Sequence, residues 1–333
     1  MPQSPLTQAR FAAIDALKAA GIVCVVFVHA LPAPWQPSAS PLAIWLGHLT
    51  RFGVPAFLFA SGFLYATRSR VPAATTWRRL RRILAPYLVA SLLAQLWRIT
   101  AHAPSNAGST WADLLLGSSF GPYYYVFVIA LLVALTPLFA RAAPRHLAAL
   151  LLILLVCQWC VDAALLLPLP FYWHLRNPLL WWPFFALGWL ARLHREALDT
   201  WLARGRRTTC AALAAGIGLL AAAAALDGHA PRLLVRSAAW LEIYAVLGLI
   251  YAWACARPEP APLLRGASQA SYAVYLFHPF FVLAAQIAAN AWLGDLEPFA
   301  VALAWAAGLL GPALLVIAAR RLLGARSLDV IGA

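Results

Sequence analysis

The fold is decided by the first apolar stretch of the chain, Phe11-Ala-Ala-Ile-Asp15-Ala-Leu-Lys18-Ala-Ala-Gly-Ile-Val-Cys-Val-Val-Phe-Val-His29-Ala-Leu31. A membrane-spanning helix needs about 20 consecutive, mostly apolar residues, and this stretch is long enough. It nevertheless contains three ionisable side chains, Asp15, Lys18 and His29. Ionisable residues are costly inside a membrane and usually serve a function there, so the stretch predicts a transmembrane helix that carries chemistry.

The composition extends this prediction to the whole chain. Of its 333 residues, 63% are hydrophobic and 11% are charged, whereas soluble domains are typically about a quarter charged. Ten apolar runs are long enough to be spans: 12–31, 43–66, 83–101, 122–140, 146–167, 178–193, 209–226, 237–255, 269–290 and 298–319. We therefore expect an all-α protein, a polytopic bundle of about ten transmembrane helices, with one domain covering residues 1–333.

The positive charges predict how this bundle sits in the membrane. Nineteen of the 25 Lys and Arg residues fall in or beside loops on one side, whereas the opposite loops carry only Arg176, Arg232 and Arg236. Because cytoplasmic loops are enriched in Lys and Arg, both termini are expected to be cytoplasmic, in a multi-pass protein of the cell (inner) membrane. The net charge of +14 lies in short clusters between apolar runs, without a recognition motif, which excludes nucleic acid as a partner and leaves membrane lipids.

The three ionisable residues of the first run share one helix face. Lys18 and His29 are eleven residues apart, which is three turns plus about 20°, or about 16 Å along the axis. Asp15 precedes Lys18 by three residues and lies within its reach. In a structural interpretation, Asp15 pairs with Lys18, whose amine extends toward the interface, and His29 forms an interfacial hydrogen bond. In a functional interpretation, Lys18 meets an anionic group from the cytoplasm and His29 acts as a general base.

The ninth run carries a second polar face. Ser271, Tyr275 and His278 follow one another at helical spacing, Tyr272 lies beside them, and Pro279 loosens the helix at this point. These four polar side chains predict a wall that faces the interior of the bundle and orients substrates. A hydrogen-bond network between helices is the structural alternative.

A basic cluster lies between the second and third runs. It consists of Arg78, Arg79, Arg81 and Arg82. Arginines beside a membrane span commonly contact lipid phosphates, and this is the simpler interpretation. The planar guanidinium group also suits the phosphates of a nucleotide, so the cluster is a candidate for that role as well.

The remaining polar and aromatic features are less informative. Tyr123, Tyr124 and Tyr125 are typical of an aromatic belt at the membrane interface. Glu242 is a single acid early in the eighth run, and whether it forms a structural pair or takes part in catalysis stays open. The Cys157-x-x-Cys160 pair lies inside an apolar run without a second pair of ligands, so no metal site and no bound cofactor are expected.

At this point the sequence resembles a known family, the acyltransferase-3 family of membrane O-acyltransferases. That family begins with an Asp-x-x-(Arg or Lys)-x10-His pattern, which Asp15, Lys18 and His29 match. Further resemblances follow in the same order: the segment from Gly53 to Gly62, the Arg-x-x-Arg element within Arg78 to Arg82, the stretch from Pro122 to Pro137, Phe184-Phe-Ala-Leu-Gly188, and Ser271-Tyr272-Ala-Val-Tyr275-Leu-Phe-His278-Pro279. Lys18 stands where Arg is commoner, and a lysine cannot make the bidentate contact of an arginine.

The resemblance implies a reaction. Acyl-CoA, most simply acetyl-CoA, is the co-substrate and arrives from the cytoplasm, and the acceptor is a hydroxyl of a cell-envelope sugar or glycolipid. His29 is then the general base, with Lys18 and Asp15 also placed in the catalytic group. Arg78, Arg79, Arg81 and Arg82 bind acyl-CoA, and Ser271, Tyr272, Tyr275 and His278 are candidates for orienting substrates. The chain is expected to act as a stand-alone domain, without a fused hydrolase-like domain.

A transporter or flippase of a glycan or lipid-linked precursor is the alternative from another class. Such a protein would use the same charged interior as a pathway, and transporters of this kind are commonly built from internal repeats. The two halves of this sequence have no such internal similarity. The acceptor, the acyl group and the oligomeric state do not follow from the sequence.

Overall fold

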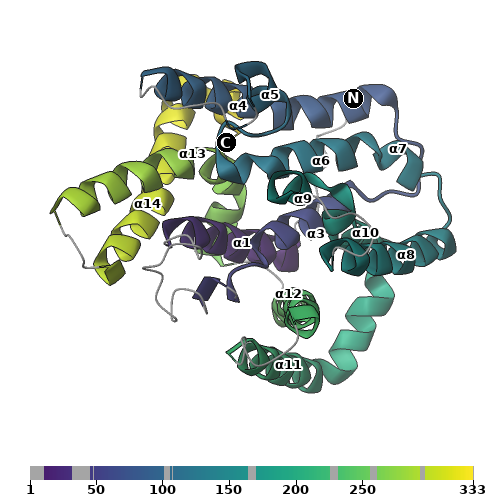
Figure 1. The fold of residues 1–333 in the computed structure, drawn as a ribbon. Coiled ribbons are helices and arrows are strands. Elements are labelled where there is room, and N and C mark those ends of the chain that lie inside the picture. The colour runs from purple at the N-terminus through teal and green to yellow at the C-terminus, as the bar shows by residue number, and fades with distance from the viewer. Residues whose placement is uncertain are drawn as a thin grey trace.

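A computed structural model describes residues 11–31, 46–47, 49–100, 106, 108–163, 170–225, 232–255, 261–292 and 297–332 (Figure 1). The part so described consists of helices and contains no strand, which confirms the predicted all-α class. The helices are α1 (Ala12–Ala30), α3 (Gly53–Tyr65), α4 (Ala73–Thr100), α5 (Thr110–Leu115), η1 (Gly121–Tyr123), α6 (Tyr124–Ala134), α7 (Thr136–Phe139), α8 (Pro144–Asp162), α9 (Phe171–Arg176), α10 (Pro178–Leu193), α11 (Arg195–Ala225), α12 (Arg232–Ala254), α13 (Pro262–Trp292), α14 (Glu297–Leu323), η2 (Gly324–Arg326) and α15 (Ser327–Ile331).

Six segments within these described ranges are long and apolar enough to cross a membrane. They are Ala12–Ala30, Ala73–Thr100, Pro144–Asp162, Ser237–Ala254, Pro262–Ala289 and Pro298–Ile331. The described parts of the other four predicted runs are mostly helical, but α3 and α10 are shorter, α11 starts before its run at Arg195 and is kinked at Gly205, and the run 122–140 is divided into η1, α6 and α7. The protein is therefore a helical membrane protein, while the count of ten spans and the cytoplasmic placement of both termini stay predictions.

Helix α1 lies at the centre of the bundle. It packs against α3 on one side and against α13 and α14 on the other, and α10 and α8 continue the row beyond α3. Helices α4 and α6 lie together above this row in Figure 1, and α12 packs against α1 from below, with α11 beyond it. The first apolar stretch of the sequence thus becomes the helix around which the others are arranged.

Two glycines allow α3 and α10 to touch backbone to backbone. A Cβ atom on Gly62 would collide with the backbone of Phe185, and one on Gly188 would collide with the backbone of Phe59. Small residues permit such close approach between membrane helices, where packing drives association. The two glycines belong to the segments Gly53–Gly62 and Phe184–Gly188 that carry the family resemblance, so the structure gives these segments a packing role.

The segment before α6 is held inside the bundle by a buried ion pair. Arg98 of α4 donates to the carboxylate of Asp113 of α5 at 3.0 Å, and the two side chains are 6% and 0% exposed. Gln95 also donates to Asp113, at 3.3 Å. After Gly117, which adopts a positive φ of 65°, the chain turns inward, and Arg176 of α9 donates to the Gly117 carbonyl at 3.0 Å. Helix α6 therefore starts deep in the protein.

This inward turn makes the predicted aromatic belt wrong. Tyr123 is 0% exposed and Tyr125 is 6% exposed, and both belong to the hydrophobic core. Tyrosines of a belt lie at the membrane interface with their hydroxyls in water. Here the hydroxyl of Tyr123 instead donates to the carbonyl of Leu276 in α13, at 2.5 Å.

Candidate active site

The polar faces of α1 and α13 meet along their length. Near the N-terminal end of α1, the hydroxyl of Ser268 donates to one carboxylate oxygen of Asp15 at 2.5 Å. The other carboxylate oxygen of Asp15 is buried without a hydrogen-bond partner in the described part of the chain. Near the last turn of α1, the ring of His29 lies 5.4 Å from the ring of His278, measured between centroids. Both contacts follow the chain direction, so the two helices run parallel, and the two polar stripes of the sequence form one interface.

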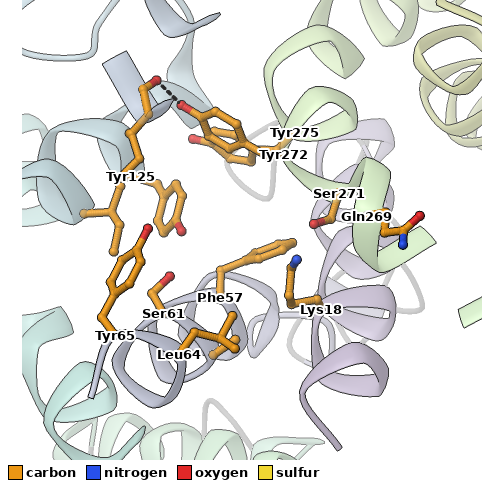
Figure 2. Close-up of a pocket in the computed structure, with 13 residues that line it drawn as sticks. Lys18, Phe57, Ser61, Leu64, Tyr65, Tyr125, Gln269, Ser271, Tyr272 and Tyr275 are labelled. Carbon is orange, nitrogen blue, oxygen red and sulfur yellow. Dashed lines mark hydrogen bonds between the residues drawn. The ribbon is translucent and has the colours of Figure 1, made fainter. Parts of the chain in front are cut away.

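A cavity of about 160 Å³ opens beside this interface (Figure 2). Helix α1 contributes Lys18, α3 and α6 contribute the opposite wall, and α13 closes the top. Its lining residues are Lys18, Phe57, Ala60, Ser61, Leu64, Tyr65, Ile83, Tyr125, Ile129, Gln269, Ser271, Tyr272 and Tyr275. In Figure 2, Lys18 and Ser271 lie on one side of the cavity, and Tyr65 and Tyr125 on the other. The cavity therefore combines one cationic amine with several hydroxyl groups and an otherwise apolar wall.

Hydrogen bonds to the backbone of other segments fix the tyrosines of this wall. Tyr272 donates to the carbonyl of Ile83 in α4 at 2.6 Å, a bond drawn in Figure 2. Tyr275 donates to the carbonyl of Pro122 in η1. Since a buried hydroxyl that loses its partner is costly, each of these rings has one favoured position. The wall is consequently preorganised, a property that active sites need.

The four arginines of the basic cluster separate into two pairs. The guanidinium of Arg79 lies over the ring of Tyr65, 4.6 Å from its centroid, and its Nη1 atom is buried without a hydrogen-bond partner. Arg82 is exposed, one helical turn further, and acts electrostatically on the same tyrosine. Because Tyr65 lines the cavity, Arg79 lies beside the cavity wall, and Arg82 follows it by three residues on the same side of α4.

The other two arginines are engaged away from the cavity. Arg78 is exposed and donates to Thr75 of its own helix at 3.3 Å. Arg81 forms an ion pair at 3.2 Å with Asp329 of α15, and both side chains are more than half exposed. The sequence assigned the same role to all four residues, whereas the structure brings only Arg79 and Arg82 to the candidate site.

The two histidines lie next to the cavity and do not line it. Tyr275 forms part of the cavity wall, and its ring centroid is 6.1 Å from that of His278. His278 is 0% exposed, whereas His29 is partly exposed. Ring contacts therefore connect the cavity wall at Tyr275 with His278 and, through His278, with His29.

Several residues of the site were not singled out in the sequence. Ser61, Tyr65 and Gln269 line the cavity, and Ser268 binds Asp15. Ser61 lies inside a segment that resembles the family, but one serine in an apolar run gives no signal of its own. Ser268 comes three residues before Ser271, and Gln269 comes three residues before Tyr272, so extending the polar face of the ninth run by a turn would have found them.

Comparison with known proteins places this geometry in a family. A family model described as an acyltransferase domain, that of the acyltransferase-3 family, matches residues 11–321. The chain therefore belongs to the acyltransferase-3 family. It is an O-acyltransferase of the membrane, and it transfers groups other than aminoacyl groups. No curated protein and no solved structure matches the chain.

Proposed function

We propose that the protein transfers an acetyl group from cytoplasmic acetyl-CoA to a hydroxyl of a cell-envelope sugar or lipid-linked glycan, in the inner membrane. The observation that carries the proposal is a cavity with a lysine in its wall, where Arg79 packs on the lining residue Tyr65 and His278 neighbours the lining residue Tyr275. The predicted sidedness of the chain puts the arginines toward the cytoplasm and His29 toward the outer face.

The arginine end suits the phosphates of the donor. Arg79 combines a buried, unpartnered Nη1 atom with a position against Tyr65 of the cavity wall, and Arg82 adds a second positive charge on the same helix face. Guanidinium groups bind phosphate with paired hydrogen bonds, which a coenzyme A phosphate offers. Lys18 carries the positive charge further inward, where it meets the polar end of the donor's arm.

The size of the cavity favours a small acyl group. A cavity of roughly 150 Å³ accommodates a molecule such as benzene, and the cavity here is about 160 Å³. A space of this size holds the end of the donor's arm, with the acetyl thioester at the Tyr275 wall that faces the histidines, and the nucleotide then remains outside, beside Arg79 and Arg82. An acetyl group therefore suits this cavity better than a long acyl chain does.

The histidine end suits the acceptor. An acceptor hydroxyl loses its proton to His29, and its oxygen attacks the thioester carbonyl carbon. The bond from that carbon to sulfur breaks, and the CoA thiolate then takes up the proton from the imidazolium. Acetyl-CoA and the free hydroxyl thereby become an O-acetyl ester and free CoA, and His29 returns to its neutral form. A histidine is suited to this role because its ordinary pKa lies near neutral pH.

The test compares the envelope glycans of cells with and without the gene by mass spectrometry. A mass difference of one acetyl group on a glycan or glycolipid supports the proposal. Loss of the exported glycan, with the remaining intracellular glycan unaltered in mass, would instead identify a transporter or flippase. Glycans of equal mass and amount in the two strains would contradict both functions.

A further inference from the structure

The histidine His278 has a hydrogen-bonding arrangement that determines where its proton lies. Its Nδ1 atom is 2.8 Å from the carbonyl oxygen of Tyr275 and 3.2 Å from that of Val274, both in its own helix. A carbonyl oxygen can only accept a hydrogen bond, so Nδ1 carries the proton. The opposite ring nitrogen, Nε2, is then a lone-pair acceptor in the neutral imidazole.

This acceptor is buried and has no partner. His278 is 0% exposed, and its Nε2 atom makes no hydrogen bond within the described part of the chain. A buried polar atom without a partner destabilises the folded state, and such atoms are uncommon in folded proteins unless they serve a purpose. The Nδ1 contacts already attach the ring to its own helix, so packing of α13 does not explain Nε2.

The separation between the rings of His29 and His278 is close to that of a hydrogen-bonded imidazole pair. An N–H···N contact of about 3 Å between two imidazoles puts their centroids roughly 5 Å apart. The observed separation is 5.4 Å, with 33° between the ring planes. Turning an imidazole by half a rotation exchanges its nitrogen and carbon positions, and the two orientations are hard to tell apart. A rotation of this kind, with a small shift, brings an N–H of His29 to Nε2.

Close packing keeps the two rings together. Gly308 of α14 lies against the pair from a third helix, and a Cβ atom there would overlap Val26 of α1 and Val282 of α13. The same Cβ position is 3.8 Å from the Cβ of His278. Helix α14 therefore presses α1 and α13 against each other at the level of the two histidines.

We propose that His278 is a positioning residue that accepts a hydrogen bond from His29 and thereby fixes its tautomer. One ring nitrogen of His29 donates to Nε2 of His278, and the other keeps its lone pair for the acceptor hydroxyl. The same bond strengthens when His29 becomes an imidazolium, since a charged donor makes a stronger hydrogen bond. A carboxylate often orients a catalytic histidine, but a neutral imidazole avoids burying a charge in the membrane. This inference rests on the proposed role of His29 as the general base.

Three substitutions at one position separate the acceptor atom from the rest of the side chain. His278→Phe keeps the ring volume and removes both nitrogens. His278→Asn keeps an N–H near the Nδ1 position but does not reach the Nε2 position. His278→Gln places its amide oxygen, an acceptor, near the Nε2 position. If the hydrogen bond from Nδ1 to its own helix determines activity, the Asn variant is the most active of the three. If the acceptor at the Nε2 position determines activity, the Gln variant is the most active.

The assay uses the full chain in inside-out membrane vesicles with radiolabelled acetyl-CoA, and the initial rate of label transfer is divided by the amount of protein. We expect kcat to fall about 10–100-fold in the Phe and Asn variants, which is the size of effect typical of residues that orient a ligand or catalytic group. In the Gln variant, kcat should stay within about fivefold of wild type. The KM for acetyl-CoA stays unchanged in all three. Trp305→Phe, which removes a 3.2 Å hydrogen bond from α14 to Val23 of α1, is the matched control and keeps its kcat.

The outcomes separate this proposal from the proposed function. The positioning role is supported if the wild type transfers the label, His29→Ala does not, and kcat is higher in the Gln variant than in the Asn and Phe variants. The positioning role alone is overturned if the wild type transfers the label, His29→Ala does not, and all His278 variants have equal kcat. A higher kcat in the Asn variant than in the Gln variant would overturn it as well. No transfer by the wild type from acetyl-CoA would instead contradict the proposed function.

Discussion

Removing the two arginines on the cavity side of α4 should weaken donor binding much more than removing their two neighbours. Arg79 is half-buried and has a free guanidinium nitrogen, so its contact with a phosphate is worth about 2 kcal/mol, within the range for charged hydrogen bonds. Arg82 is exposed, and its contribution is limited to about 1 kcal/mol. Together they amount to about 3 kcal/mol, or roughly a 100-fold change in Kd.

The matched control has the same loss of charge on the same helix. Arg78→Gln with Arg81→Gln removes two arginines that contact Thr75 and Asp329 rather than the cavity wall. These exposed contacts are worth about 0–1 kcal/mol each, and because both side chains are exposed to screening, their loss should change donor affinity by no more than about threefold.

The assay is equilibrium binding of radiolabelled acetyl-CoA to purified protein in lipid nanodiscs. We expect a Kd raised by about 100-fold for Arg79→Gln with Arg82→Gln, and a Kd close to wild type for the control pair. Equal Kd values for the two double variants would refute the assignment of Arg79 and Arg82 to the donor site. So would a wild-type Kd in the first double variant when its thermal stability is unchanged.

Three further predictions concern stability and acyl-group size. Asp113→Asn leaves the buried Arg98 without its counter-charge and should destabilise the protein by about 3–5 kcal/mol. Asp329→Asn breaks an exposed pair and should cost about 0–1 kcal/mol. Thermal unfolding in detergent, followed by Trp fluorescence, compares the two variants, and equal unfolding midpoints would contradict a stabilising role of the buried pair. Gly62→Leu separates α3 from α10, so we expect no monodisperse protein in size-exclusion chromatography. Gly216→Leu on α11, where nothing lies within 4 Å of an added Cβ atom, should behave as wild type. A monodisperse Gly62→Leu protein would disprove the close crossing of α3 and α10. Ile129→Ala enlarges the cavity and should raise kcat/KM for butyryl-CoA relative to acetyl-CoA by about 10-fold or more. Ile153→Ala changes a side chain of a residue that is 60% exposed and should leave that ratio unchanged. An unchanged ratio in Ile129→Ala would show that the acyl group does not bind in this cavity.

The helices and the polar faces could be predicted from the sequence because both depend on local pattern. The first run indicated that Asp15, Lys18 and His29 share a helix face, and the ninth run indicated a stripe through Ser271 and His278. That these two faces meet each other is a long-range packing result. It depends on Gly308 and on the interlocking of three helices, which the spacing of residues within one helix does not specify.

The error at Tyr123 and Tyr125 has a similar cause. Tyrosines that flank an apolar run normally mark the membrane interface, and the sequence rule assumes that the run starts there. Here the Arg98–Asp113 pair and the turn at Gly117 draw the chain into the bundle before α6 begins. The division of the arginines into two pairs also depends on tertiary contacts, since Tyr65 belongs to the preceding helix α3 and Asp329 to α15.

The central claim is that His29 receives the acceptor's proton while the acyl group comes from acetyl-CoA on the cytoplasmic side. The most direct measurement adds radiolabelled acetyl-CoA, which does not cross membranes, to inside-out and right-side-out vesicles that contain equal amounts of wild-type protein or His29→Ala. The account predicts label in the glycan and glycolipid fraction only for wild-type protein in inside-out vesicles. Equal labelling by His29→Ala, or labelling by the wild type in right-side-out vesicles alone, would contradict it.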